Sequence, residues 1–217
     1  MKFENKIETS SAQVASIIRQ AIITGELKPG TRLVEQDLTK FLDISRSPIR
    51  EAFRILESEG LVRIIPNKGT FVIQLNEKDL KEIYELRKLL EAYAIRMACS
   101  SMTKEDLEEL KVIIKKMERR LELKDYIGYL KSSHEFHECF IKKCKNERLF
   151  NLFRVLRNNI IAIQIFAYSY PERSSDSLEE HRKILSALLK KNPDKAEGYL
   201  RKHLEYGYER AREFLKK

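Results

Sequence analysis

The feature that most constrains this chain is the run from Ser45 to Gly60, which carries an apolar stripe and a basic stripe at helical spacing. Four apolar residues recur at intervals of three or four and form one face of the predicted helix: Ile49, Ala52, Phe53 and Leu56. Every fourth residue on another face is an arginine: Arg46, Arg50 and Arg54. Ser45 can cap this helix, and Gly60 can end it. Such a helix suits the major groove of DNA, or it is a surface helix whose charges are solvated.

The neighbouring residues favour the DNA-binding interpretation. Residues 33–42 predict a short preceding helix, so the two helices and the turn between them form a helix-turn-helix. After the second helix, the β-rich runs 61–65 and 70–73 flank a Pro-Asn-Lys-Gly turn, which predicts a hairpin. Lys68 and Gly69 fall at the hairpin tip, where a cation and an uncovered backbone can approach phosphates. The predicted fold of this part of the chain is a winged helix-turn-helix.

Composition and charge agree with a mainly α DNA-binding protein without determining it. The 217 residues include 7 Gly and 5 Pro, which favours helices, and 42% hydrophobic residues, which can fill real cores. The formal net charge of +9 suits a polyanionic partner. Residues 1–75 nevertheless carry 11 Lys and Arg against 9 Asp and Glu, so the DNA argument depends on where the arginines lie. The sequence has no long uncharged apolar run, so we expect no membrane-spanning helix. The spacing of the three cysteines fits neither a metal site nor a disulfide framework, which predicts reduced thiols in a cytoplasmic protein.

The rest of the chain is predicted to be an all-α bundle of six helices. Asn76 can cap a long helix to about residue 100, which sets the domain boundary and gives domains of residues 1–75 and 76–217. Periodicity and capping signals then predict five further helices: residues 103–123, 124–144, 148–170, 177–191 and 193–215. Pro171 is predicted to end the third of these five, and Ser177 to open the fourth through a capping box. The fold class is therefore mainly α, with an N-terminal winged helix-turn-helix and a C-terminal helical bundle.

All four histidines lie in the helical half, each on the apolar stripe of its helix: His134, His137, His181 and His203. A single inward histidine is usually a hydrogen-bonded core residue. Inward histidines on three helices of one bundle each need a buried partner, which a shared metal ion would supply through the ring nitrogens. Both interpretations stay open from the spacing alone.

Two sets of segments resemble a known family. In the N-terminal half the resemblance is to the GntR family of bacterial transcription regulators, through the segments Gly25–Leu33, Ser45–Ala52, Glu59–Val62 and Asn67–Val72. In the C-terminal half it is to the ligand-binding FCD domain of the FadR subfamily, in its smaller six-helix branch, through Tyr84–Glu91, Glu135–His137, Lys145–Leu149, Glu180–Leu185 and His203–Leu204. The resemblance implies a homodimer on a palindromic operator and an effector that is an organic acid or sugar acid.

The resemblance also implies a metal site, and this chain departs from it at one position. Metal-binding members use three histidines at the positions of His137, His181 and His203, together with an aspartate one turn before the first. Here that position holds Ser133, whose hydroxyl is a poor substitute for a carboxylate on a divalent ion. His134 could act as a fourth ligand, or solvent or effector oxygens could complete the site. Zinc or nickel is the expected ion.

Arg87 is an inward charge on the first long helix and has two possible roles. It can pair with Glu91 one turn away, or it can clamp the carboxylate of a small acid bound beside the metal. Arg87 and Ser133 are therefore the candidate effector contacts.

The predicted function is a DNA-binding transcription regulator whose operator affinity is controlled by a small carboxylate effector. Nine residues are predicted to contact DNA: Gln36, Ser45, Arg46, Ser47, Arg50, Arg54, Lys68, Gly69 and Thr70. One alternative keeps the regulator but gives it a metal-free pocket for a larger, acyl-CoA-type effector. A metal enzyme is the other alternative, and we do not favour it, because the histidines of the His134–His137 segment are three residues apart instead of the four of a zinc-protease signature.

Overall fold

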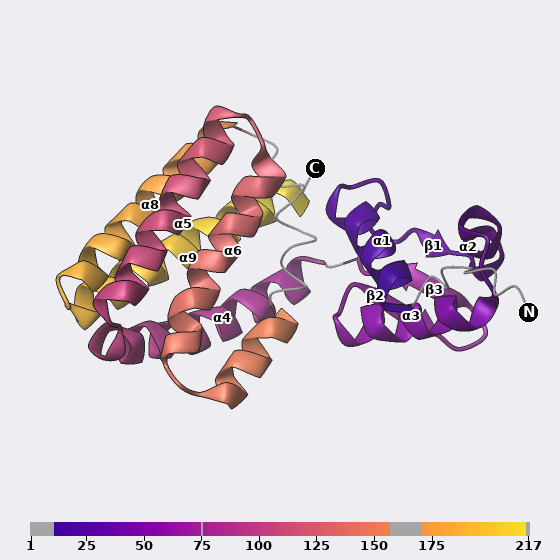
Figure 1. Ribbon diagram of the computed structural model, residues 1–217, viewed down its shortest axis with the longest axis horizontal. Helices are drawn as coiled ribbons and strands as arrows, with labels where there is room; N and C mark the ends of the chain where they lie inside the picture. The colour runs from indigo at the N-terminus through magenta and orange to yellow at the C-terminus, as the bar shows by residue number, and fades with distance from the viewer. Residues whose placement is uncertain (1–10, 75, 157–170, 216–217) are drawn as a thin grey trace, which may run out of the picture. The chain divides into compact units, whose positions relative to one another are not determined.

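The computed structural model describes residues 11–74, 76–156 and 171–215, which form two compact units, Met1–Gln74 and Leu75–Lys217 (Figure 1). Each unit has its own apolar core. In the described part of the chain, no helix combines the length and the apolar character that a membrane crossing requires.

The first unit is a winged helix-turn-helix. Its elements in chain order are α1 (Ser11–Ile23), β1 (Arg32–Leu33), α2 (Glu35–Leu42), α3 (Arg46–Ser58), β2 (Val62–Ile65) and β3 (Gly69–Val72). The three strands form an antiparallel sheet in the order β1-β3-β2, with Ile65 opposite Gly69 at the tip of the hairpin. The predicted helix-turn-helix and hairpin are confirmed. The short strand β1 was not predicted, because two residues carry too little periodicity to be distinguished from the turn before them.

Helix α3 is positioned by the apolar face that the sequence predicts. Four side chains of this face are buried in the core of the unit: Ile49, Ala52, Phe53 and Leu56. Gly60 ends the helix in the left-handed conformation, with φ of 72°. The Gly60 and Leu61 amides donate to the carbonyls of Glu57 and Leu56, each at 2.9 Å. This arrangement satisfies two of the last helical carbonyls and turns the chain directly into β2. Ser45 occupies the N-cap position without a side-chain capping bond.

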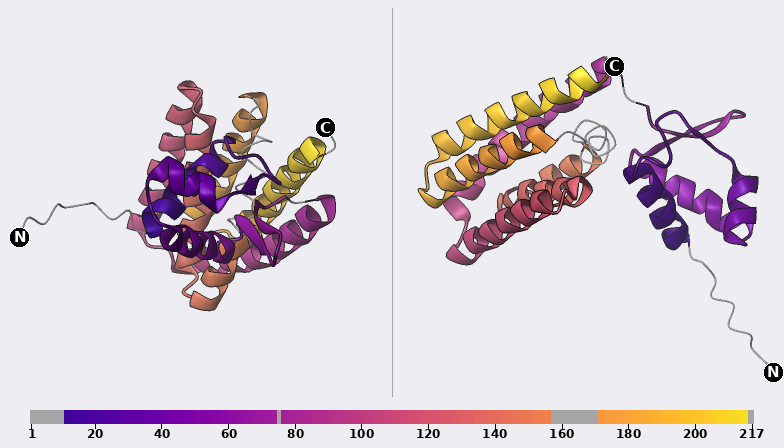
Figure 2. Two further views of the ribbon diagram at one scale, coloured as in Figure 1. Left: turned by 90° about the vertical axis from the view of Figure 1, so that its right-hand side faces the viewer. Right: turned by 90° about the horizontal axis from the view of Figure 1, so that it is seen from above.

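The second unit is a bundle of long helices. Its elements are α4 (Glu77–Ser101), α5 (Lys104–Glu122), α6 (Tyr126–Lys143), a helical stretch at residues 147–156, α8 (Pro171–Leu189) and α9 (Pro193–Leu215). Helix α9 packs against α4 and α8, and α5 packs against α6 and α8 (Figure 2). The apolar faces of these helices enclose a large core, which contains Ile95, Met117, Phe136, Phe140 and Leu200 among others. The predicted all-α architecture of this half is confirmed.

The helix starts follow from local capping chemistry. The side chains of Asn76 and Thr103 accept the backbone N–H groups of Asp79 and Asp106, whose carboxylates accept the cap N–H groups in return. Both helix starts were predicted from these residues. Helix α6 begins two residues later than predicted, because Lys124 has a positive φ of 55° and cannot be helical.

The predicted start of the next helix at Ser177 is wrong. Pro171 begins α8, and Ser177 lies inside that helix, so the Ser177 capping box does not open it. Proline at the first helical position is favourable, since the N–H that it lacks has no intrahelical partner there. The preceding predicted helix is observed at residues 147–156, and its remainder lies outside the described residues.

Candidate functional site

Three of the four histidines meet inside the helical unit. His137 lies on α6, His181 on α8 and His203 on α9. Each histidine offers one ring nitrogen to the group, and these three nitrogen atoms all lie within 4.8 Å of one another. The three residues are 1%, 0% and 5% exposed, so the apolar stripes that carry them have placed three imidazoles in the interior. This is the donor set that a divalent transition metal prefers.

Each imidazole donates its Nδ1–H outward and turns Nε2 toward the others. His181 Nδ1 lies 2.6 Å from the Ser177 carbonyl oxygen, which can only accept. His137 Nδ1 lies 2.6 Å from Glu91 Oε2, and His203 Nδ1 lies 2.7 Å from Glu180 Oε2. Burial lowers the pKa of all three imidazoles well below its usual value, so they are neutral, with the proton on Nδ1 and the lone pair on Nε2.

The facing Nε2 atoms fit a bound cation. His137 Nε2 and His203 Nε2 are 3.2 Å apart, and with both protons on Nδ1 this distance brings two lone pairs together. Zinc held at about 2.0–2.1 Å in tetrahedral geometry separates two nitrogen ligands by about 3.3–3.4 Å. The residues present therefore suit a metal ion, and their outer hydrogen bonds supply the orientation that metal-binding imidazoles normally have.

The carboxylates that orient the imidazoles are each paired with a buried or half-buried arginine. Arg87 Nε donates to Glu91 Oε1 at 2.6 Å, which confirms the predicted Arg87–Glu91 pair. Arg210 Nη2 donates to Glu180 Oε2 at 3.0 Å. Sequence reasoning missed the contacts of Glu91 and Glu180 with the histidines. A weak signal was present, because Glu91 follows the inward Arg87 by one turn and Glu180 directly precedes His181.

Ser133 belongs to the site, and His134 is placed differently from the other histidines. The Ser133 hydroxyl is 3.1 Å from His181 Nε2. Since Nδ1 of that ring carries the proton, Ser133 donates to the Nε2 lone pair. His134 is buried on α6 at 6% exposure, outside the group of three whose nitrogen atoms converge.

The residues predicted to contact DNA lie on the winged helix-turn-helix, and most are exposed. Seven of them are exposed: Gln36, Ser45, Arg46, Ser47, Arg50, Arg54 and Lys68. Gly69 is half-buried, while Thr70 is 5% exposed and offers little side-chain surface to a phosphate. Arg50 Nε donates to both carboxylate oxygens of Glu35 at 3.0 Å, and Arg54 pairs with Glu51 at 2.7 Å. DNA must therefore compete with these two carboxylates for the arginine stripe.

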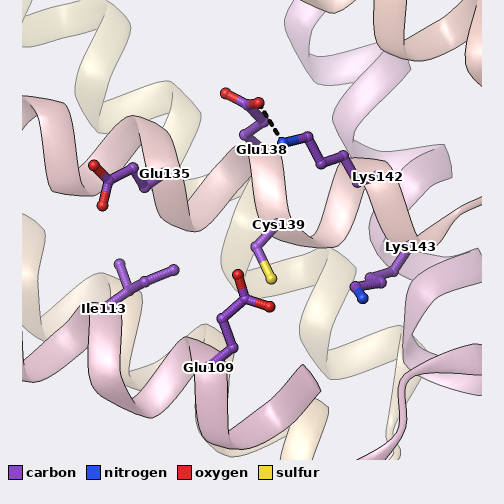
Figure 3. A pocket seen from close by; sticks show the side chains of 7 residues that line it. All are labelled: Glu109, Ile113, Glu135, Glu138, Cys139, Lys142 and Lys143. Atoms are coloured by element: carbon purple, nitrogen blue, oxygen red, sulfur yellow. Dashed lines mark ion pairs between the residues drawn. The ribbon is translucent and has the colours of Figure 1, made fainter. Parts of the chain in front are cut away.

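A separate pocket of about 420 Å³ lies between α5 and α6 (Figure 3). Its lining is mostly charged: Glu109, Ile113, Glu135, Glu138, Cys139, Lys142 and Lys143. Lys142 pairs with Glu138 at 2.8 Å, and Lys143 pairs with Asp106 at 2.6 Å. Because these lysines already have carboxylate partners, the pocket has no strong preference for an anion or a cation.

The Cys139 thiol in this pocket is expected to resist alkylation in the folded protein. Burial and the nearby Glu109 carboxylate raise its pKa to about 12, so about one thiol in ten thousand is ionised at pH 8. Iodoacetamide followed by peptide mass spectrometry should leave Cys139 unmodified, whereas the same treatment in urea should label it fully. Rapid labelling without urea would contradict the buried position of the thiol.

Comparisons with known proteins agree with the two units. The family model described as "Bacterial regulatory proteins, gntR family" matches residues 10–72, and that of the FCD domain matches residues 82–206. The uncharacterized HTH-type transcriptional regulator YdhC of Bacillus subtilis (strain 168) is 30% identical over 199 residues, which is 91% of this chain and 89% of that protein. The gluconate operon transcriptional repressor of Bacillus licheniformis is 28% identical over 177 residues, 82% of this chain and 72% of that protein.

A solved structure shows the same arrangement of elements. The crystal structure of a GntR-type transcriptional regulator from Rhodococcus sp. RHA1 matches with a TM-score of 0.81 and 27% sequence identity. The match covers 93% of this chain and 96% of that one. These relatives are named as transcription regulators, and the matched gntR family is described as bacterial regulatory proteins.

Proposed function

The chain belongs to the GntR family of bacterial regulatory proteins, with an FCD domain as its helical half, and we propose that a small acid bound at a metal in that domain controls its binding to an operator. The observation that carries the proposal is the convergence of three buried imidazoles, each held by an outward Nδ1 hydrogen bond. A core that needed only apolar packing would gain nothing from three buried imidazoles aligned in this way.

The winged helix-turn-helix supplies the DNA contacts. Arg46 and Arg50, near the start of α3, read base edges in the major groove, most simply guanines. Arg54 lies one turn further along and meets a phosphate, as do the hydroxyls of Ser45 and Ser47. Gln36 at the start of α2 hydrogen-bonds base or backbone. Lys68 and Gly69, at the wing tip, approach the phosphates or the minor groove.

The metal is a divalent ion, zinc or nickel, held by Nε2 of His137, His181 and His203. Bound there, it acts as a Lewis acid for an oxygen ligand of the effector. Glu91 and Glu180 hold the imidazole rings of His137 and His203 in place. The surrounding apolar core keeps water away from the three histidines.

The effector class is a small carboxylate. Metal coordination suits a hard oxygen anion, and the gluconate operon repressor among the relatives is named for a sugar acid. An alternative is a metal-free pocket for a larger acyl-CoA-type ligand, which the neutral Ser133 in place of a carboxylate favours. Metal content distinguishes the two.

The test is metal content by plasma mass spectrometry on full-length protein purified without an affinity tag. We expect one divalent ion per chain, lost when His137 and His181 are both changed to alanine. Protein without metal, even after dialysis against zinc, nickel and manganese in the presence of acetate, would exclude the metal site and leave the acyl-CoA-type alternative. The DNA-binding assignment does not depend on this result.

The regulator acts as a homodimer, and one face of α4 suits a second copy of the chain. Four large apolar side chains at intervals of three or four residues are exposed on this face: Leu86, Leu89, Tyr93 and Met97. They lie away from the buried face of α4 that contacts α6 and α9. Two copies of the stripe can cover each other by two-fold symmetry, which also fits a palindromic operator.

Leu89→Glu is expected to weaken this dimer. A charge in the middle of the apolar stripe should raise the dimer dissociation constant by about tenfold or more. Leu123→Glu is the matched control, because Leu123 is 61% exposed against 64% for Leu89 and lies at the end of α5, outside the stripe. Sedimentation velocity of both variants over a concentration series measures the change. Equal dissociation constants would place the interface elsewhere.

A further inference from the structure

The carboxylates around the three histidines do not provide charge for a metal ion. Glu91 is held by Arg87 on one oxygen and by His137 Nδ1 on the other, at 2.6 Å each. Glu180 is likewise shared between His203 Nδ1 and Arg210. Both carboxylates lie on the outer, Nδ1 side of the rings, and an arginine neutralises each. The inner side therefore presents three neutral nitrogen ligands.

Ser133 adds an oxygen to the inner side, but no charge. It lies one turn before His137 on α6, and its hydroxyl donates to His181 Nε2 across 3.1 Å. The hydroxyl thus occupies the lone pair that a metal ion needs, and it must rotate away for the ion to bind. A divalent ion that replaces this hydrogen bond keeps its full double charge inside a buried site.

A buried double charge is costly unless an anion accompanies it. Moving an ion from water into a protein interior costs several kcal/mol even after relaxation, and an opposite charge in contact with the ion offsets much of this cost. Three nitrogen ligands also leave a position open on zinc or a similar metal. An anion at that position would neutralise the site and complete the coordination in one step.

We propose that this site takes up its metal ion together with an anion, and that the lack of charge on the Ser133 side chain makes the two bindings interdependent. The inference rests on the proposed function, because it takes the three-histidine metal site as given. Its consequence is reciprocal: a carboxylate effector strengthens metal binding by the same factor by which the metal strengthens effector binding. Metal occupancy would then follow effector concentration.

Cobalt(II) and azide are suitable probes, since cobalt absorbs visible light according to its coordination and azide is a small monodentate anion. Full-length protein is titrated with cobalt(II), with and without saturating azide, and the cobalt–azide equilibrium without protein is subtracted. For the wild type we expect azide to raise the apparent cobalt affinity by about 5- to 150-fold, the usual range of coupling between sites. Acetate repeats the experiment with a carboxylate.

Variants at Ser133 separate charge from shape. Ser133→Asp supplies the negative charge itself, so it should bind cobalt more tightly without azide, by a factor similar to the azide effect, and should then respond little to azide. Asparagine has nearly the shape of aspartate without its charge, so Ser133→Asn should keep the azide effect on cobalt affinity. Ser133→Ala removes only the hydroxyl and should keep the azide effect as well. Circular dichroism checks that each variant is folded.

The outcomes separate the inference from the proposed function. If the change of His137 and His181 to alanine leaves cobalt binding unaltered, the metal site itself is wrong. If those changes abolish binding, but azide and Ser133→Asp leave the cobalt affinity of the site unchanged, the site stands and the coupling is wrong. If Ser133→Asn bound cobalt as tightly as Ser133→Asp does, charge at residue 133 would not be the cause of the tighter binding.

Discussion

Replacing Glu91 with alanine is expected to destabilise the helical unit by about 3–5 kcal/mol, the usual cost of removing one partner of a buried ion pair. Glu91 is fully buried and Arg87 is 2% exposed, so the guanidinium would remain inside without the carboxylate that neutralises it. His137 would also lose the acceptor of its Nδ1–H. The measurement is urea unfolding followed by circular dichroism, with the free energy of unfolding extrapolated to water.

Glu82→Ala on the same helix is the matched control. The Glu82 side chain is 60% exposed and its carboxylate pairs only loosely with Lys78, at 3.8 Å, so its loss should change the free energy of unfolding by less than about 0.5 kcal/mol. Changing Arg87 to Met and Glu91 to Leu together should restore most of the stability, because the buried charges are removed as a pair. Equal unfolding midpoints for Glu91→Ala and Glu82→Ala would contradict the buried pair.

The same double variant connects stability to function. It should be folded, yet it leaves the His137 ring without the carboxylate that orients it. Loss of such an outer partner typically weakens metal binding by about 10- to 100-fold. A folded double variant with wild-type metal affinity would show that Glu91 serves stability alone.

Arg50→Ala is expected to weaken operator binding by about 1–3 kcal/mol for each half-site and to relax the preference at one position of that half-site. The operator is first selected with the wild-type protein from random-sequence duplexes, and affinities are then measured at one fixed salt concentration. Arg46→Ala should act in the same way at another position. Arg54→Ala should instead weaken binding to all sequences alike. It should also reduce by about one the slope of the logarithm of the binding constant against the logarithm of the salt concentration.

Two controls make this prediction sharper. Glu35→Gln releases Arg50 from the carboxylate that it contacts in the free protein, so it should leave the selected operator unchanged and not weaken its binding. Arg182→Ala removes one exposed positive charge from α8 of the helical unit and should leave the sequence preference unaltered. Unchanged operator affinity in Arg50→Ala would remove Arg50 from the base-reading set.

The outcome at α3 shows how much local pattern can determine. The apolar residues Ile49, Phe53 and Leu56 are buried and Gly60 ends the helix in the left-handed conformation, as their spacing predicts. Capping at Asn76 and Thr103 follows in the same way from residues within one helical turn. These features depend on interactions between near neighbours in the chain, and the same local signals predict both the winged helix-turn-helix and the helical bundle.

Local pattern was a poor guide where two interpretations shared one signal. The segment from Ser177 has the spacing of a capping box, yet it lies in the middle of α8, because Pro171 can begin a helix as readily as it can follow one. The two-residue strand β1 is defined by its pairing with β3 and carries no pattern of its own.

By itself the sequence determined that the histidines face inward, since each lies on the apolar stripe of its helix. The spacing alone did not determine which of them meet, although the family resemblance implied a shared site of His137, His181 and His203. His137, His181 and His203 are brought together by the packing of α6, α8 and α9, which also selects Glu91 and Glu180 as their partners and sets Ser133 against His181. Helical periodicity fixes the direction of a side chain about its own axis, whereas contacts between residues far apart in the chain exist only once the helices have packed.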